Sequence, residues 1–129
     1  MEDENRFIML IDDNDITLES VSEALHLHGF QNHMFNDPHR AVAAYNPSLY
    51  PIIIVDYNMP GMTGIEVLKE IRKQKPDAKV IIYTGLPDAR VRRRIIQSGA
   101  DEFYKTDKLQ QLIEKLETMI DEIKEENNQ

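Results

Sequence analysis

Three short runs of apolar residues interrupt the chain, and none of them alternates with polar positions. They cover residues 7–11, 52–55 and 80–83 and are rich in Ile, Val and aromatic side chains. Two weaker runs lie at residues 31–35 and 102–104. Continuous short runs of this kind are typical of strands buried on both faces, as in a parallel sheet. The pattern therefore predicts five strands.

Between these runs, apolar residues recur at spacings of three and four, which places them on one face of a helix. Asp37 followed by Pro38 is typical of an N-cap and a first helical residue, and Gly29 and Gly99 suit helix C-terminal ends. Strands that alternate with helices predict an α/β fold with right-handed crossovers and a doubly wound parallel sheet. The apolar stripes of the five predicted helices are Leu18, Val21 and Leu25; Ala41, Val42 and Tyr45; Ile65, Leu68 and Ile71; Val91, Ile95 and Ser98; and Leu109, Leu112, Ile113, Leu116, Ile120 and Ile123.

The length of 129 residues predicts one domain over residues 1–129. Its core is expected to span about residues 6–123, because the last apolar stripe ends there. The polar tail at 124–129 is expected to fray. No linker or low-complexity segment divides the chain.

Composition excludes several classes of function. The chain has 15 basic and 23 acidic residues and a formal net charge of −8, which argues against direct, non-specific nucleic-acid binding. It has no cysteine, so disulfides, thiolate zinc sites and cysteine nucleophiles are excluded. No apolar run approaches the roughly 20 residues of a membrane helix, and the acidic start at residues 1–4 does not resemble a signal peptide. A cytoplasmic protein without a membrane partner is expected.

Chemically active residues follow the predicted strands. Asp12 and Asp13 follow the first strand, Asp56 ends the third, Thr84 ends the fourth, and Lys105 follows the fifth. The carboxyl ends of parallel strands meet at one edge of the sheet, where open α/β folds bind their ligands. We therefore expect these side chains to converge.

Three carboxylates in one place repel one another unless a cation neutralises them. Oxygen ligands favour Mg²⁺, and the lack of thiols or of His after a strand disfavours softer metals. An ammonium group at Lys105 and a hydroxyl at Thr84 can contact phosphate oxygens. A cation, an ammonium and a hydroxyl around the ionised Asp56 describe a site that accepts a phosphoryl group.

These residues resemble the receiver domain of two-component response regulators, in particular the chemotaxis-regulator type. The resemblance rests on Asp12-Asp13, Asp56, Met59-Pro60-Gly61, Thr84-Gly85 and Lys105, in the family's order and near its spacing, and covers about residues 6–123. It implies a flavodoxin-like fold with a five-stranded parallel sheet, five helices and strand order 2-1-3-4-5. It also implies a signalling switch that assists its own phosphorylation and dephosphorylation, rather than an enzyme.

The resemblance implies a role for each site residue. Asp56 would be the phosphoacceptor, and Asp13, Asp56 and the backbone carbonyl of Asn58 would bind Mg²⁺, with Asp12 acting through water. Lys105 would pair with the phosphoryl group, and Thr84 would move toward it as the switch. The implied partners are a sensor histidine kinase or a histidine phosphotransfer protein, together with a downstream target or an output domain; a homodimer is a further option.

The chain departs from the family pattern in two ways. Thr106 follows Lys105, where the family usually has Pro. Glu102 occupies the usual aromatic switch position, so Phe103 is the candidate for that role.

Two alternatives stay open. The first is a pseudo-receiver that has lost phosphorylation and serves as a docking module, which the departures near Lys105 would allow. The second is a phosphatase that resembles haloacid dehalogenases and forms an aspartyl phosphate. That class needs a second acid two positions after its nucleophile, where this chain has Asn58.

Overall fold

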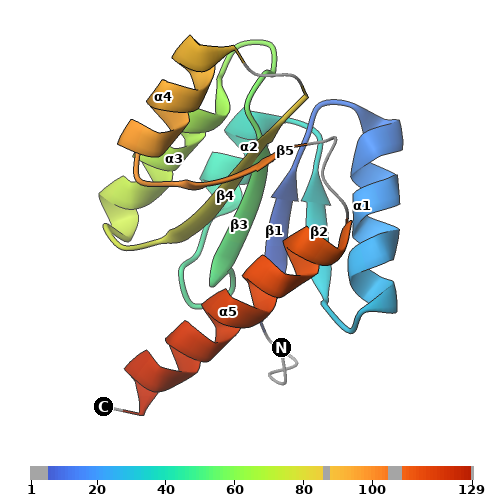
Figure 1. The fold of residues 1–129 in the computed structure, drawn as a ribbon, viewed down its shortest axis with the longest axis vertical. Coiled ribbons are helices and arrows are strands. Elements are labelled where there is room, and N and C mark those ends of the chain that lie inside the picture. The colour runs from blue at the N-terminus through green and yellow to red at the C-terminus, as the bar shows by residue number, and fades with distance from the viewer. Residues whose placement is uncertain (1–5, 86–87, 105–108, 129) are drawn as a thin grey trace.

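The computed structural model describes residues 6–85, 88–104 and 109–128, and for residues 102–104 and 109 only the backbone. Strands and helices alternate along the chain (Figure 1). The strands are β1 (Ile8–Ile11), β2 (Asn32–Phe35), β3 (Ile52–Asp56), β4 (Lys79–Thr84) and β5 (Asp101–Tyr104). The helices are α1 (Asp15–Leu27), α2 (Pro38–Ala44), α3 (Gly64–Gln74), α4 (Ala89–Gln97) and α5 (Leu109–Asn127).

The strands form one parallel sheet in the order β2-β1-β3-β4-β5. Its central strands pair with Ile11 of β1 beside Val55 of β3, and with Asp56 of β3 beside Tyr83 of β4. The prediction of a flavodoxin-like α/β fold with a parallel sheet and five helices is confirmed.

Each face of the sheet is covered by helices, and successive residues of the strands alternate between the two faces. Met9, Ile53 and Ile82 belong to the core cluster that includes residues of α2, α3 and α4. Ile8, Ile54 and Ile81 belong to the cluster that includes residues of α1 and α5. Figure 1 shows the two layers, with α1 and α5 on one side of the sheet and α2, α3 and α4 on the other. This alternation fixes which face each residue at a strand end continues.

Local signals in the sequence set the helix ends. The Asn14 side chain accepts a hydrogen bond of 3.0 Å from the Thr17 backbone N–H and caps α1. Asp37 caps α2, with Pro38 as its first residue, as predicted. Gly29 and Gly99 follow α1 and α4 with φ of 84° and 82°, a conformation that glycine adopts without steric cost.

The last helix is longer than the sequence analysis expects. α5 continues to Asn127, so the expectation of a frayed tail from residue 124 is wrong for residues 124–127. Lys79 of β4 lies 3.3 Å from a carboxylate oxygen of Glu122 and 3.5 Å from one of Glu126. These ion pairs attach the final turns of the helix to the sheet. Within the described residues, α5 and the shorter helices all lack the combination of length and apolar character that crossing a membrane requires.

Candidate metal centre

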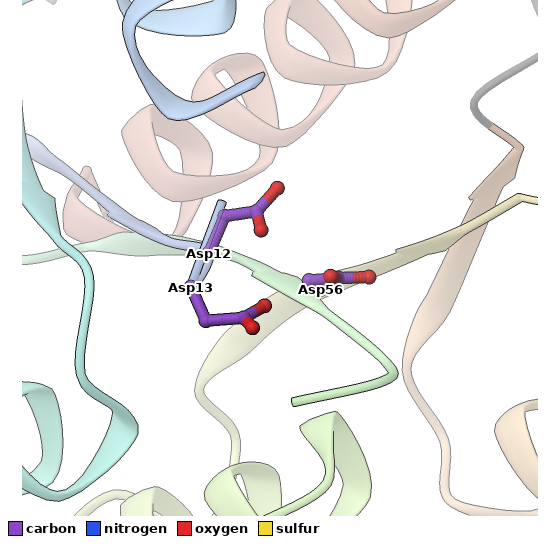
Figure 2. Close-up of side chains that lie close together, drawn as sticks. All are labelled: Asp12, Asp13 and Asp56. Carbon is purple, nitrogen blue, oxygen red and sulfur yellow. The ribbon is translucent and has the colours of Figure 1, made fainter. Parts of the chain in front are cut away.

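Three carboxylates meet at the carboxyl edge of the sheet. Asp12, Asp13 and Asp56 each offer one oxygen, and these oxygens lie within 4.8 Å of one another. Figure 2 shows the three side chains next to one another, two from the end of β1 and one from β3. Asp12 is 0% exposed and Asp56 is 4% exposed, whereas Asp13 reaches solvent. The cluster is therefore open on one side and buried on the other.

Strand register explains the meeting. Ile11 pairs with Val55, so Asp12 and Asp56 are the next residues of two adjacent strands. They continue the series of residues that face α1 and α5, in which Leu10 and Ile54 are the preceding members. The two acids thus lie on the same face of the sheet as these core residues, at the carboxyl ends of the two strands.

Hydrogen bonds hold Asp12 on both carboxylate oxygens. The Asn14 backbone N–H donates to Oδ1 at 2.9 Å, and the Tyr83 hydroxyl donates to Oδ2. Burial raises the pKa of Tyr83 far above its usual value, and the nearby Asp12 carboxylate raises it further. The hydroxyl therefore keeps its proton at neutral pH and remains a hydrogen-bond donor.

The backbone after Asp56 is anchored on both sides. The Tyr57 N–H donates to the carbonyl of Tyr83 at 2.9 Å, and the Tyr57 carbonyl accepts from the Gly64 N–H at 2.9 Å. The Asn58 N–H lies 3.5 Å from Asp56 Oδ1. A Cβ on Gly64 would lie 2.8 Å from the Asp56 carbonyl oxygen, so only glycine allows α3 to approach this strand end so closely.

The loop that follows contains Met59-Pro60-Gly61. Met59 is buried in the core cluster beneath α2 and α3. Gly61 has a φ of 81°, and Pro followed by Gly is the usual pair at the two central positions of a type II turn. The side chain of His39, at the start of α2, lies beside it: a Cβ on Gly61 would be 3.4 Å from Nε2. The packing and the turn of this loop fix the backbone position of Asn58.

The remaining predicted site residues fall into two groups. Thr84 is the last residue of β4, at the same edge of the sheet, and is 9% exposed. A Cβ on Gly85, the next residue, would meet no atom within 4 Å among the residues that the structure describes. Lys105 and Thr106, and the side chains of Glu102 and Phe103, lie outside the described residues.

The donor set fits a hard divalent cation. All three side chains of the cluster offer carboxylate oxygens, and Asn58 lies two residues beyond Asp56 on an exposed loop. Mg²⁺ prefers such ligands and usually keeps several waters, for which the exposed side at Asp13 leaves access. Two buried carboxylates this close repel one another, and a bound cation would offset that repulsion.

Two residues near the cluster were not predicted from the sequence. The sequence analysis places Tyr83 inside a predicted strand. Its hydroxyl is the one polar side-chain group in the apolar run at residues 80–83, and this is the signal that could have identified Tyr83 as a site residue. No local pattern marks Gly64, because glycine is required there by a tertiary contact between the start of α3 and the end of β3.

Comparisons with known proteins agree with this geometry. Residues 8–117 match the family model described as the response regulator receiver domain. A cyclic di-GMP phosphodiesterase of Thermotoga maritima is 31% identical over 98 residues, which cover 76% of this chain and 26% of that protein. The C4-dicarboxylate transport transcriptional regulatory protein DctD of Rhizobium meliloti is 32% identical over 96 residues, which cover 74% of this chain and 21% of that protein. The chain thus spans about a quarter or less of the length of these two relatives.

Solved structures share the fold. A response regulator receiver domain protein from Clostridium thermocellum superposes with a TM-score of 0.86 at 25% identity, over 92% of this chain and 97% of that one. A CheY-like receiver domain protein from Methanospirillum hungatei gives 0.84 at 24% identity, over 94% and 98% of the two chains. The chain belongs to the response regulator receiver domain family of two-component signalling.

Proposed function

We propose that the chain is a phosphoacceptor switch in which Asp56 accepts a phosphoryl group and the change alters partner binding. The observation that carries this proposal is the cluster of Asp12, Asp13 and Asp56, whose ligand oxygens lie within 4.8 Å of one another at the edge of the sheet. Membership of the receiver family, whose members are signalling switches rather than enzymes, supports the same role.

Asp56 is the nucleophile in this proposal. A carboxylate oxygen forms a bond to the phosphorus of a phosphohistidine, the phosphorus–nitrogen bond breaks, and the imidazole keeps the electron pair. The product is an acyl phosphate on Asp56, which water later hydrolyses. An aspartate is ionised at neutral pH, so it needs no general base for the attack.

Positive charge is needed because a carboxylate and a phosphoryl group repel one another. Asp12, Asp13, Asp56 and the backbone carbonyl of Asn58 would hold Mg²⁺, with Asp12 acting through water. When bound, Mg²⁺ supplies charge that neutralises the phosphoryl oxygens. Lys105 adds an ammonium group in the same role.

Switching is assigned to Thr84 and Phe103. The Thr84 hydroxyl would donate to a phosphoryl oxygen and draw the end of β4 toward Asp56, and its place at the carboxyl end of β4 supports this role. Phe103, which pairs with Tyr83 along the backbone of β5, would follow as the aromatic switch. Phosphorylation then shifts a population between two states by the difference in their affinity for the phosphoryl group.

The partners follow from this chemistry. The donor would be a sensor histidine kinase or a histidine phosphotransfer protein. The receiver of the signal would be a downstream protein or an output domain, and a homodimer is a further form that the active state could take. Residues 1–129 would form one receiver domain.

The test is direct phosphorylation. The protein is incubated with Mg²⁺ and acetyl phosphate, a small phosphodonor, and its intact mass is measured alongside Asp56→Asn and Glu117→Gln. Glu117 is an exposed acid on α5 that is not part of the cluster, so its variant controls for the loss of one negative charge. We expect one phosphate on the wild type and on Glu117→Gln, and none on Asp56→Asn. An unlabelled wild type, or equal labelling of Asp56→Asn, would refute the proposal and favour a docking module.

A further inference from the structure

We propose that Tyr83 is a positioning residue for the metal centre, and that its hydroxyl holds the Asp12 carboxylate in the orientation that cation binding requires. This inference rests on the proposed function of the carboxylate cluster. It adds a residue from β4 to a centre otherwise built from the ends of β1 and β3.

The geometry of the sheet makes the contact unusual. β3 lies between β1 and β4, yet the Tyr83 hydroxyl reaches the Asp12 carboxylate. The Tyr83 side chain must therefore cross β3, on the face where Tyr83 and Asp56 are register partners. A side chain shorter than that of tyrosine at position 83 could not reach across β3 to Asp12.

The aromatic ring is fixed by its surroundings. Tyr83 is 4% exposed and belongs to the cluster that includes Leu18 of α1 and Leu112 of α5. Packing on both sides restricts the rotation of the ring, so the hydroxyl is delivered to one place. An outer hydrogen-bond partner held in this way orients a ligand before the ion arrives.

The contact leaves Asp12 able to act on a cation. Asn14 N–H donates to Oδ1 and the Tyr83 hydroxyl donates to Oδ2. Each carboxylate oxygen can accept two hydrogen bonds or ligand contacts, so each has capacity left for a metal-bound water or the ion.

The test removes only the hydroxyl. Mg²⁺ binding is measured by isothermal titration calorimetry for the wild type, Tyr83→Phe and Tyr50→Phe. Tyr50 is a matched control because it is also buried and its hydroxyl also makes a side-chain hydrogen bond, to His33 at 2.8 Å. We expect the Mg²⁺ dissociation constant to rise about tenfold in Tyr83→Phe and to stay unchanged in Tyr50→Phe.

A double-mutant cycle separates positioning from general stability. In an Asp12→Ala background, Tyr83→Phe should leave the remaining Mg²⁺ affinity unchanged, because the carboxylate that the hydroxyl orients is gone. The thermal midpoint without Mg²⁺ is recorded for every variant. If Tyr83→Phe does not fold, Tyr83→Met, which fills apolar space without a donor, takes its place.

The outcomes distinguish this inference from the proposed function. Equal or tighter Mg²⁺ binding by the hydroxyl-free variant overturns the inference, as does an equal loss in the Asp12→Ala background. A wild type that neither binds Mg²⁺ nor accepts a phosphate overturns the proposed function itself. A wild type that does both, beside an unaffected Tyr83→Phe, overturns the inference alone.

Discussion

The metal-free protein should become more stable when one acid of the cluster is neutralised. The change is Asp56→Asn, which keeps the size and one oxygen of the side chain but removes its charge. Asp56 is 4% exposed and Asp12 is 0% exposed, and their ligand oxygens lie within 4.8 Å. Folding brings these like charges together, so the native state carries a repulsion that the unfolded chain does not.

The size of the effect follows from Coulomb's law. Two unit charges at 4.8 Å repel by about 3.5 kcal/mol at an effective dielectric constant of about 20. Asp13 is exposed, so solvent screens its share. Favourable contacts of the Asp56 carboxylate, such as the one with the Asn58 N–H, are weakened by the same change. We expect a net gain of about 1–3 kcal/mol in the free energy of unfolding.

The assay is urea unfolding followed by circular dichroism, with EDTA and again with Mg²⁺. A bound cation stabilises the native state in proportion to the logarithm of its concentration over its dissociation constant. We therefore expect Mg²⁺ to stabilise the wild type more than Asp56→Asn, so that the advantage of the variant shrinks or reverses.

The control is Glu117→Gln, which changes the net charge by the same amount on an exposed face of α5. It should unfold within about 0.5 kcal/mol of the wild type under both conditions. A lower stability of Asp56→Asn than of the wild type in EDTA would contradict this prediction. An equal gain in stability for Glu117→Gln would contradict it too, because the change would then come from the overall net charge.

Three further substitutions test how the structure around the site is held, each by urea unfolding. Gly64→Ala should lower the free energy of unfolding by about 1–3 kcal/mol, because its Cβ would lie 2.8 Å from the Asp56 carbonyl oxygen; unchanged stability would contradict that close approach. Arg72→Met should lower the free energy of unfolding by about 2–3 kcal/mol. The Arg72 guanidinium on α3 donates to the backbone carbonyls of Ser98 at 2.8 Å, Ala78 at 3.2 Å and Gly99 at 3.4 Å, which join α3 to the segments just before β4 and just after α4. Arg72→Lys should recover part of the loss. Ser22→Ala should lower the free energy of unfolding by about 1–2 kcal/mol, because the Ser22 hydroxyl donates to Oδ1 of the buried Asn32 side chain at 2.6 Å. Unchanged stability would mean that another donor replaces the hydroxyl.

Most of the fold follows from local patterns. The runs at residues 7–11, 52–55 and 80–83 overlap three strands, β1, β3 and β4, which are almost wholly buried. Asp37 with Pro38 begins α2 as predicted. The extent of α5 was not predictable in this way, because the contacts of Lys79 with the last turns join residues more than 40 positions apart and no local pattern reports them.

Part of the site was also accessible from sequence. Asp12, Asp13 and Asp56 stand at the ends of two strands of a parallel sheet, so they were expected to meet at one edge, and they do lie together there. This expectation needs only parallel strands and no knowledge of their register. Gly64 was out of reach for the opposite reason, because its requirement depends on the packing of a helix start against one carbonyl.

Tyr83 shows where register becomes decisive. On β1 and β3, even-numbered residues such as Leu10 and Ile54 face α1 and α5, and on β4 the odd-numbered Ile81 and Tyr83 do so. Asp12 and Asp56 continue the first two series, so the acids and the tyrosine share one face only because Asp56 is paired with Tyr83. A slip of one residue between β3 and β4 would turn the hydroxyl toward α3 and leave Asp12 with the Asn14 N–H alone from this pair of donors. The register between β3 and β4, which aligns the core residues of these strands, thus also decides which side chain can orient Asp12. The site residues continue the same face of the sheet as the core residues that pack against α1 and α5.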